Sequence, residues 1–323
     1  MDKNALLIVN PISGTRAKRD LPQTVVSRLG EWGWSTEIAL TKGPGDATQL
    51  ASVAAASGEY SVVIAAGGDG TVNETARGLI DTDTPLAIIP CGSGNGLARH
   101  LNIPLDTGMA LDIINSGTLI KADYATANNR PFFCTCGVGF DAAVSERFAT
   151  KNRRGLMTYL QTAFETVVRY SPTTYTIEAN GLTLTHEAFL VAVCNASQYG
   201  NNAFIAPGAS IVDGVLDVIV LHAGNPFETM KFGLEVMSGT LNRNAQVDIV
   251  RTSSLSITRN TDGPAHLDGE PVDNLGHRLE IVCHPGCLKM IVPSSIPQFK
   301  PLVTPLTAFV RDMRLTFRHL LKI

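Results

Sequence analysis

Residues 61–74 read SVVIAAGGDGTVNE. The apolar and β-branched residues of Ser61–Ala66 favour a buried strand, and the glycines of Gly67–Gly68 free the backbone so that its N–H groups can converge on an anion. We expect a helix over Thr71–Ile80, with the positive end of its dipole at the same point. Asp69 places a negative charge where a metal-bound phosphate would lie. These residues predict a strand, a phosphate-binding loop and a helix in succession.

A second loop of similar build follows after a short interval. The apolar run Leu86–Ile89 ends at Pro90, and the loop Gly92–Gly96 (GSGNG) then opens into the helix-forming segment Leu97–Leu101. Each glycine loop taken alone is equally compatible with an ordinary turn. Because ligands of open parallel sheets bind beyond the carboxyl ends of the strands, we expect both loops at one ligand-binding edge.

The residues before these loops alternate between strand and helix patterns. Asn4–Val9 is predicted to be a buried strand that breaks at Asn10–Gly14, and Ser35–Leu40 is the next predicted strand. Leu21–Leu29 has apolar residues at helical spacing, and Ala47–Ala56 is rich in alanine. The alternation predicts parallel βαβ units.

Five short motifs occur in order along the chain. They are NPISG at 10–14, GGDGTVNE at 67–74, PCGSGN at 90–95, AP at 206–207 with DGVLDV at 213–218, and LDGE at 267–270. Together they resemble the diacylglycerol kinase catalytic domain superfamily, which includes bacterial soluble lipid kinases and sphingosine kinases. The resemblance extends from about Leu6 to about Pro293.

The resemblance implies two domains with the active site in the cleft between them. A Rossmann-like three-layer α/β/α domain that binds ATP is expected over 1–125, and a β-sandwich domain that binds lipid is expected over 126–300. The 323 residues independently suggest about two domains. Short apolar runs separated by turn residues after Phe132 are typical of a β-sandwich or barrel. Helices are expected to interrupt them at Leu156–Tyr170 and Phe227–Met237.

The last segment, 301–323, is predicted to be an amphipathic helix. Pro305 follows Thr304, a suitable N-cap, and apolar residues recur at helical spacing as far as Leu321, with basic residues between them. Such a helix could rest on an anionic membrane surface, which would give transient contact with the membrane that holds a lipid substrate. Alternatively, it could dock on its own domain or on a second subunit in a homodimer.

Composition limits the classes of partner. With 26 basic and 29 acidic side chains, the formal charge is −3, which offers no global attraction to nucleic acid. No apolar stretch approaches the ~20 residues needed to span a bilayer, and the first residues lack the pattern of a signal peptide. We therefore expect a soluble, cytoplasmic protein that is at most peripheral at the inner membrane surface.

Four of the cysteines are candidate zinc ligands. Cys134 and Cys136 are expected on one face of a strand, and Cys283 and Cys287 flank His284 near a turn. Their spacing differs from paired C-x-x-C motifs, so reduced thiols in the core are the preferred interpretation.

The resemblance also implies which residues contact ATP and Mg²⁺. Because phosphoryl transfer requires mainly positioning and electrostatic stabilisation, backbone N–H groups, the metal ion and a few cations would supply much of the catalysis. The basic residues Arg16, Lys18 and Arg19 either neutralise the transferring phosphate or are solvated. The expected ATP-binding residues are Asn10, Thr41, Gly67, Gly68, Asp69, Gly70, Thr71, Val72, Asn73, Gly92 and Ser93.

Two carboxylates compete for the role of catalytic base. The Asp-Gly-Glu element favours Glu270, which would accept the proton of the lipid hydroxyl. Asp69 is the alternative, since the corresponding aspartate of related sphingosine kinases is usually given that role. Asp268 and Gly269 are also a strong signal for a hairpin turn, and a turn can carry a catalytic residue.

Two further sites follow from the resemblance. A structural Mg²⁺ is expected at Ser210, Asp213 and Val215, although Asp-Gly at 213–214 could be only a turn. Asp141 corresponds to a position near the lipid headgroup, where it could pair an ammonium group, orient a hydroxyl or cap the next helix.

The leading functional hypothesis is an ATP-dependent lipid kinase that transfers the γ-phosphoryl group to the alcohol group of a diacylglycerol- or sphingosine-type lipid. An NAD kinase-like phosphotransferase is the alternative, because it shares the glycine loop and the two-domain plan. A non-catalytic nucleotide-binding protein is a third candidate, supported only by the weak fingerprint in the second loop. Ser93 and Asn95-Gly96 replace the Thr and Asn-Asp that are common in bacterial diacylglycerol kinases, which favours sphingoid-type acceptors slightly.

Overall fold

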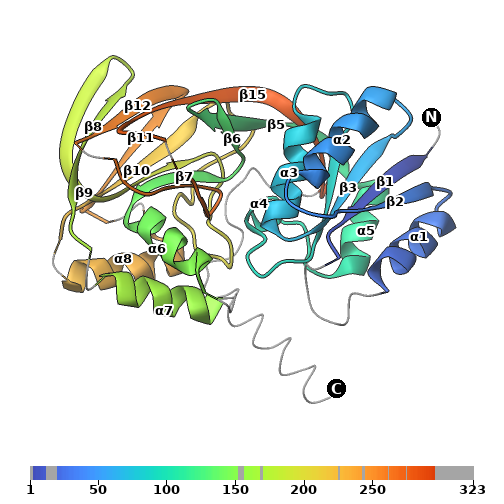
Figure 1. The fold of residues 1–323 in the computed structure, drawn as a ribbon, viewed down its shortest axis with the longest axis horizontal. Coiled ribbons are helices and arrows are strands. Elements are labelled where there is room, and N and C mark those ends of the chain that lie inside the picture. Colours follow the sequence, from blue (N-terminus) through green and yellow to red (C-terminus); the bar gives the residue numbers. More distant parts are fainter. Residues whose placement is uncertain are drawn as a thin grey trace. The chain divides into compact units, whose positions relative to one another are not determined.

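The fold consists of two compact units (Figure 1). The computed structural model describes residues 3–294 except 12–19, 152–155, 168–169, 225, 242–243, 261 and 274. The first unit holds the described residues up to Phe133 together with Ile211–Val215 and those from Val282 onward. The second unit holds those of Cys134–Ser210 and Leu216–Ile281.

The chain passes between the units more than once. Sequence patterns predict contiguous domains over 1–125 and 126–300, whereas the first unit also takes in two later segments. The long strand β15 (Arg278–Val292) begins in the second unit and continues into the first, where Met290 pairs with Leu86. The predicted helix over 301–323 lies outside the described residues.

The first unit alternates strands and helices, as the sequence predicts. Its strands are β1 (Asn4–Val9), β2 (Ser35–Leu40), β3 (Val62–Gly67), β4 (Leu86–Pro90), β5 (Thr118–Ala127) and β6 (Arg130–Phe132). Its helices are α1 (Leu21–Glu31), α2 (Asp46–Ser57), α3 (Asp69–Leu79), α4 (Gly96–His100) and α5 (Thr107–Ser116). Helix α3 begins at Asp69, two residues before the predicted start.

The core of this unit is a parallel sheet with the strand order β4-β3-β1-β2. Alternate residues of these strands, such as Leu7 and Ile64, pack with Val25 of α1 and Leu111 of α5. Figure 1 shows α1 and α5 on one side of the strands and α2 and α3 on the other. The predicted three-layer α/β/α architecture is therefore confirmed.

The second unit is built mainly from antiparallel strands, which confirms the predicted β domain. Its helices are α6 (Phe140–Ala149), α7 (Leu156–Val167) and α8 (Pro226–Ser238). Its strands are β7 (Thr135–Gly139), β8 (Thr173–Ala179), β9 (Leu182–Cys194), β10 (Leu216–His222), β11 (Val247–Thr252), β12 (Ser254–Arg259), β13 (Ala265–Leu267), β14 (Glu270–Pro271) and the first residues of β15. Strand β9 pairs with β7, β8 and β10, and β10 pairs in turn with β11.

The six cysteines are free thiols, and all except Cys287 are buried. Burial, reinforced by the charge of Asp141, raises the pKa of the Cys136 thiol far above its ordinary value. The burial of Cys91, Cys134, Cys136, Cys194 and Cys283 agrees with their interpretation as thiols of the core, whereas Cys287 is only half-buried. No helix in the described part of the chain is long and apolar enough to cross a membrane.

Candidate functional site

The carboxyl ends of the parallel strands meet at one edge of the first unit. Val9 lies beside both Leu40 and Ala66, and Gly67 lies beside Pro90, so the four strands end at the same level. The register therefore brings the predicted residues Asn10, Thr41, Gly67 and Gly92, which stand at or just beyond these strand ends, to one edge.

Backbone hydrogen bonds fix the loops at this edge. The N–H of Thr41 donates to the carbonyl of Val9 over 2.9 Å, and the N–H of Cys91 donates to the carbonyl of Gly67 over 2.7 Å. Each loop is thus tied to the strand next to it.

The two glycine loops touch through their backbones. A Cβ atom added at Gly92 would lie 2.7 Å from the Cα of Gly68, and one added at Gly67 would lie 2.4 Å from the Cβ of Thr71. Real Cβ atoms do not approach so closely, so glycine is required at both positions. At Gly70, in contrast, an added Cβ would meet no heavy atom within 4 Å. The backbone of Gly70 therefore borders open space.

The carboxylate of Asp69 joins the first loop to the second. Its Oδ2 atom accepts a hydrogen bond from the N–H of Asn95 at 2.8 Å, and its Oδ1 atom accepts one from the N–H of Gly96 at 2.6 Å. A Cβ at Gly94 would lie 2.8 Å from Oδ2. Charged acceptors form strong bonds of this kind. Asp69 therefore holds the N-terminal end of α4 in place, which is a structural role in addition to the predicted role toward phosphate and metal.

The second loop also braces itself. Asn95 lies in the left-handed region, with φ +52°, which asparagine tolerates better than most residues. Its side-chain Oδ1 accepts from the N–H of Gly92 at 2.9 Å, and its Nδ2 donates to the carbonyl of Gly92 at 2.8 Å. Arg99 donates from Nε to the carbonyl of Gly94. The residues of the loop and of α4 therefore supply the contacts that fix its conformation.

The other predicted nucleotide residues differ in exposure. The side chains of Thr71, Val72 and Asn73 are buried in the first turns of α3, whereas Ser93 is exposed at the tip of the second loop. Glu74 accepts a hydrogen bond from the N–H of Ala47 at the first turn of α2 and so joins the two helices. The predicted basic residues Arg16, Lys18 and Arg19 lie outside the described residues.

The Asp-Gly-Glu element forms a hairpin turn in the second unit, as the alternative interpretation expects. Asp268 (φ +53°) and Gly269 (φ +81°) connect β13 to β14, where Leu267 pairs with Glu270. Positive φ at both central residues is typical of a type I′ turn. The side chain of Asp268 accepts hydrogen bonds from the N–H groups at 134 and 135, at 2.6 and 3.0 Å. These bonds fix the turn and leave Glu270 exposed beside it.

A buried network that sequence patterns do not predict supports this hairpin. The Oδ2 atom of Asp141 accepts from the hydroxyl of Tyr199 at 2.9 Å and lies 3.1 Å from Nε2 of His266. The Nδ1 atom of His266 accepts from the N–H of Gly269 at 3.3 Å, which assigns the ring proton to Nε2. Only a glycine fits at Gly137, because a Cβ there would lie 2.1 Å from the Asp141 carboxylate.

Asp141 itself is 3% exposed and stands in the first turn of α6. Its Oδ1 atom accepts from the N–H of Ala142, which satisfies one donor at the start of the helix. The N-cap of α6 is Gly139, so Asp141 lies inside the first turn and does not cap the helix. The structure therefore shows Asp141 in the hydrogen-bond network, whereas contact with a lipid headgroup stays a prediction. The only sequence sign of His266 is its position next to the LDGE motif.

Comparison with known proteins identifies the family. A model of the diacylglycerol kinase catalytic domain matches residues 4–127, and a model of the YegS C-terminal NAD kinase beta sandwich-like domain matches 134–292. The diacylglycerol kinase of Staphylococcus aureus (strain Newman) is 31% identical over 275 residues, which cover 84% of this chain and 87% of the relative. The chain belongs to the diacylglycerol kinase family.

Solved structures agree with this assignment. A crystal structure of a Bacillus anthracis protein assigned as a diacylglycerol kinase is 27% identical, with a TM-score of 0.75, and the match covers 91% of this chain and 99% of that one. A second Bacillus anthracis structure, described as a diacylglycerol kinase, is 24% identical with a TM-score of 0.72 over 91% of this chain and 98% of that one, and supports the fold alone. The predicted family and fold class are confirmed.

The predicted Mg²⁺ loop of this diacylglycerol kinase family member lies next to a buried carboxylate that sequence patterns do not predict. Asp123 of β5 accepts hydrogen bonds from the N–H groups of Gly214 and Gly286, both at 2.7 Å. Burial raises the pKa of Asp123, these two bonds oppose the rise, and the charge of Asp213 adds to it. Asp123 therefore joins three separate segments of the first unit and places a second carboxylate near Asp213.

A buried arginine forms hydrogen bonds with both ends of the segment that carries Glu270. Arg259 is buried, and its Nε and Nη2 atoms donate to the carbonyl of Gly276 at 3.2 and 2.8 Å, while Nη1 donates to the carbonyl of Pro264 at 2.8 Å. Pro264 and Gly276 stand at opposite ends of the segment that contains the hairpin. The planar guanidinium thus fixes both ends of the segment from Pro264 to Gly276.

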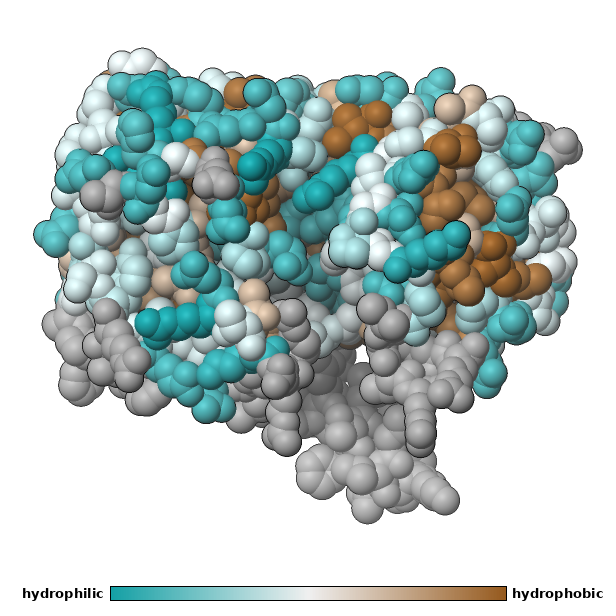
Figure 2. Space-filling view, viewed as in Figure 1, coloured by the Kyte–Doolittle hydropathy of each residue, from teal (hydrophilic) through white to brown (hydrophobic). Residues whose placement is uncertain are grey.

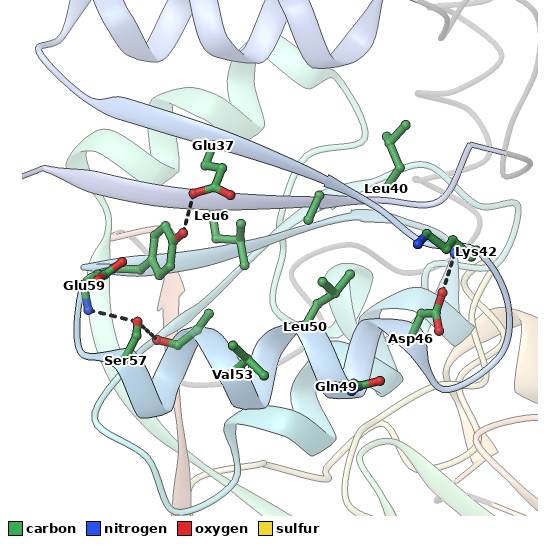
Figure 3. Close-up of a pocket in the computed structure, with 13 residues that line it drawn as sticks. Leu6, Glu37, Leu40, Lys42, Asp46, Gln49, Leu50, Val53, Ser57 and Glu59 are labelled. Carbon is green, nitrogen blue, oxygen red and sulfur yellow. Dashed lines mark hydrogen bonds between the residues drawn. The ribbon is translucent and has the colours of Figure 1, made fainter.

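A pocket of about 440 Å³ lies elsewhere in the first unit, between β2 and α2 (Figure 3). Figure 2 shows hydrophobic side chains gathered on the surface over these elements, where Leu40 and Val53 are exposed. The pocket contains no residue of either glycine loop, so it does not mark the predicted nucleotide site. Its lining residues are Leu6, Glu37, Ala39, Leu40, Lys42, Asp46, Gln49, Leu50, Val53, Ala54, Ser57, Glu59 and Tyr60.

A histidine behind the second glycine loop makes stability depend on pH. His100 at the end of α4 is buried, and burial lowers its pKa from 6.5 to about 4. Below about pH 6.5 the imidazole of His100 therefore binds a proton in the unfolded chain, whereas in the folded chain it stays neutral down to about pH 4. We expect this residue alone to lower the free energy of unfolding by about 2 kcal/mol between about pH 7.5 and pH 5.

Urea unfolding at the two pH values measures this effect. His100→Gln stays neutral throughout, so the loss of stability between the two pH values should shrink by about 2 kcal/mol in that variant. An identical loss in the wild type and His100→Gln would contradict the assignment.

Proposed function

We propose that this chain is an ATP-dependent lipid kinase that transfers the γ-phosphoryl group of ATP to a lipid hydroxyl, with diacylglycerol as the first candidate acceptor. The observation that carries the proposal is the match of residues 4–127 to the diacylglycerol kinase catalytic domain. The 31% identity to diacylglycerol kinases of Staphylococcus aureus, over 84% of this chain, supports it. A sphingosine-type acceptor, which Ser93 favours, is the second candidate.

The glycine loops suit the binding of ATP phosphates. Phosphoryl transfer needs little covalent chemistry from the protein, so its demands are positioning and neutralisation of charge. The N–H groups at the start of α3 point along the positive end of the helix dipole, and the backbone of Gly70 faces open space. Asp69 keeps the second loop in register with the first through its bonds to Asn95 and Gly96. A Mg²⁺ ion bound with ATP would neutralise the charge on the transferring group.

A separate structural Mg²⁺ is proposed for the loop 210–215. The donors there are oxygens: the carboxylate of Asp213 and the backbone carbonyls of Ser210 and Val215. Oxygen donors in small number, with water completing the shell, fit this cation. The carboxylate of Asp123 accepts a hydrogen bond from the N–H of Gly214, the residue after Asp213, so two carboxylates stand at this loop, which also fits a cation.

Glu270 is proposed as the base that accepts the proton of the lipid hydroxyl. Its side chain is exposed, so a substrate can reach it. Its backbone belongs to a turn that is fixed by the hydrogen bonds of the Asp268 carboxylate and of the His266 ring. An exposed carboxylate on a fixed backbone has the accessibility that proton transfer requires.

Transfer of radiolabel from ATP to a panel of acceptors tests the function. The panel contains diacylglycerol, sphingosine, ceramide, phosphatidylglycerol and NAD, with Asp69→Ala and Glu270→Ala as controls. We expect a labelled lipid in the wild type and strongly reduced label in both variants. Label in NAD alone would favour the NAD kinase-like alternative, to which the description of the matched C-terminal domain also points.

Transient contact with an anionic membrane through the segment 301–323 is proposed as the route to a lipid substrate. The support is the sequence pattern alone, in which arginines alternate with apolar residues. Sedimentation with phosphatidylglycerol vesicles compares the full chain with a chain that ends at Pro301. Equal binding of the two chains would remove this role.

A further inference from the structure

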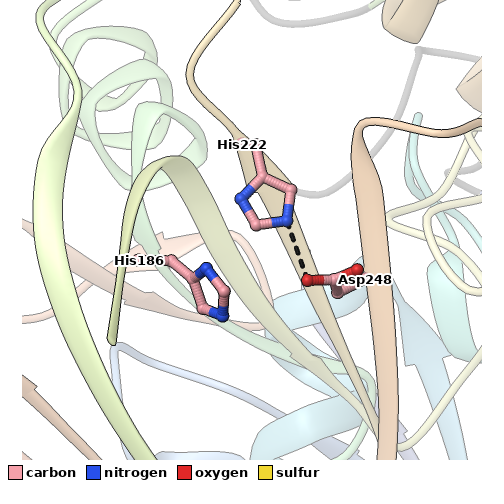
Figure 4. Close-up of side chains that lie close together, drawn as sticks. All are labelled: His186, His222 and Asp248. Carbon is pink, nitrogen blue, oxygen red and sulfur yellow. Dashed lines mark hydrogen bonds and ion pairs between the residues drawn. The ribbon is translucent and has the colours of Figure 1, made fainter. Parts of the chain in front are cut away.

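Three side chains with metal-ligand chemistry converge on the sheet of the second unit. His186 lies on β9, His222 at the end of β10 and Asp248 on β11, and Figure 4 shows them pointing toward one another. One ligand atom from each lies within 4.8 Å of the other two. No other three histidine, cysteine, aspartate or glutamate side chains in the described part of the chain come this close together, and the group contains no cysteine.

The register of the sheet places these residues on one face. Asp248 pairs with Val220, which is two residues before His222, so Asp248 and His222 share a face. A register shift at the end of β10 then sets His222 opposite Ala188, two residues after His186. The three ligands are 36 and 26 residues apart along the chain. Such spacing matches no metal-binding motif, which is why only the folded sheet reveals the group.

The contacts within the group are close and accessible. His222 Nε2 lies 2.8 Å from Asp248 Oδ2, and the ring centroids of His186 and His222 are 4.9 Å apart in an edge arrangement. The side chains of His222 and Asp248 are 24% and 51% exposed. An ion in solution can therefore reach the group, while the strands restrict how far its ligands move.

The donor set selects a class of metal. Two imidazole nitrogens with one carboxylate oxygen suit zinc and related transition metals, whereas Mg²⁺ prefers oxygen donors alone. Zinc sites with three protein ligands keep a further position for water. We propose that His186, His222 and Asp248 bind one Zn²⁺ ion.

The site would act as a clip across three strands. In the described structure β11 pairs only with β10, and Asp248 is the group's ligand on that strand. Coordination would tie β11 through the metal to β9, two strands away. Because Zn²⁺ would bind the folded sheet and not the separated strands, it would raise the thermal stability of the protein. None of these residues is assigned to phosphoryl transfer, so the proposal is independent of the kinase function.

Titration of the full chain with ZnCl₂ tests the proposal. Bound metal is first removed with EDTA, and the protein is then exchanged into a buffer with Mg²⁺, which occupies sites made of oxygen ligands alone. Calorimetry then gives the affinity for Zn²⁺, and native mass spectrometry gives the number of ions bound per chain. We expect one Zn²⁺ per chain and a higher melting temperature in its presence. His222→Ala should weaken binding by more than about 100-fold, since loss of an outer-shell partner alone costs about 10- to 100-fold.

Matched variants separate coordination from folding. Asp248→Asn keeps the size of an exposed side chain, so its melting temperature without zinc should equal that of the wild type while the zinc-dependent rise is lost. His277→Ala is the control, because His277 faces Asp262 at 3.8 Å in a similar exposed pair outside the group. This variant should bind zinc as the wild type does.

Substitution with Co²⁺ identifies the ligand atoms. Nitrogen and oxygen ligation gives visible d–d bands without the thiolate charge-transfer absorption that a cysteine site would produce. The proposal is overturned by absence of zinc binding, by a thiolate band, or by unchanged binding in His222→Ala and Asp248→Asn. In the first case His222 and Asp248 form only a hydrogen bond.

Discussion

Gly92→Ala is expected to lower the rate of phosphoryl transfer by more than about 100-fold. The added methyl group would push the two glycine loops apart, and a displacement of about 1 Å in a loop that positions the substrate has that cost. The added methyl group would lie 2.7 Å from the Cα of Gly68, 3.0 Å from Oδ1 of Asn95 and 3.6 Å from the N atom of Asp69. The nearest of these is a backbone atom, which cannot rotate away. Overpacking of this kind also lowers the free energy of unfolding by about 1–3 kcal/mol. Radiolabel transfer and urea unfolding of the same preparation measure the two effects.

Gly70→Ala is the matched comparison in the neighbouring loop. No heavy atom lies within 4 Å of the added methyl group, so the variant should be as stable as the wild type. If ATP phosphates pack against this backbone, as proposed, nucleotide affinity falls while stability is kept. If Gly70→Ala binds ATP with the affinity of the wild type, the ATP phosphates do not pack against the backbone of Gly70. If Gly92→Ala is as stable as the wild type, the two loops can move apart at a lower cost in free energy than their close contact implies.

Glu270→Gln is expected to lower kcat by about 10²- to 10⁴-fold with little change in the KM for ATP, which is the range for removal of a general base. The turn should survive, because Asp268 and His266 fix it and the side chain of Glu270 takes no part in those bonds. Steady-state kinetics with the best acceptor of the panel measure the effect. Glu187→Gln, at an exposed glutamate of the same unit, is the control and should leave kcat unchanged.

The corresponding loss in Asp69→Ala has two physical causes. Its carboxylate accepts hydrogen bonds from Asn95 and Gly96, so removal releases the second glycine loop as well as a negative charge. A low rate in Asp69→Ala therefore does not identify the base. An unchanged rate in Glu270→Gln would exclude Glu270 and return that role to Asp69.

The α/β unit could be predicted largely from local patterns. Apolar strands such as Val62–Gly67 and glycine loops at their ends carry their own signal, since β-branched residues and glycines restrict or free the backbone wherever they stand. The predicted start of helix α3, Thr71, lies two residues after the observed start, Asp69. The reason is that a phosphate-binding loop and the first turn of the helix that follows it share the same residues. The path of the chain between the units was not predictable, because no composition change marks 211–215 or the point where β15 passes from one unit to the other.

The supporting contacts of the candidate site were also beyond sequence patterns. Asp123 bonds to Gly286, 163 residues away, and Asp141 meets His266 over 125 residues. Arg259 has no motif, although it fixes both ends of the segment that holds Glu270. Burial explains these pairings, because burying a charge or an N–H group without a hydrogen-bond partner costs free energy. The partner can come from any segment that the fold places nearby.

The amino-acid sequence by itself determined the family, the two-part architecture and the residue types of the glycine loops and the Asp-Gly-Glu turn, because these depend on short stretches whose backbone preferences are local. The tertiary structure decided what those residues touch: that Gly92 must be glycine because Gly68 lies against it, that Asp69 braces the second loop, and that His186, His222 and Asp248 share a face. Packing of segments distant in sequence sets these contacts, and a hydrogen bond or a metal ligand set depends on distance in space rather than along the chain.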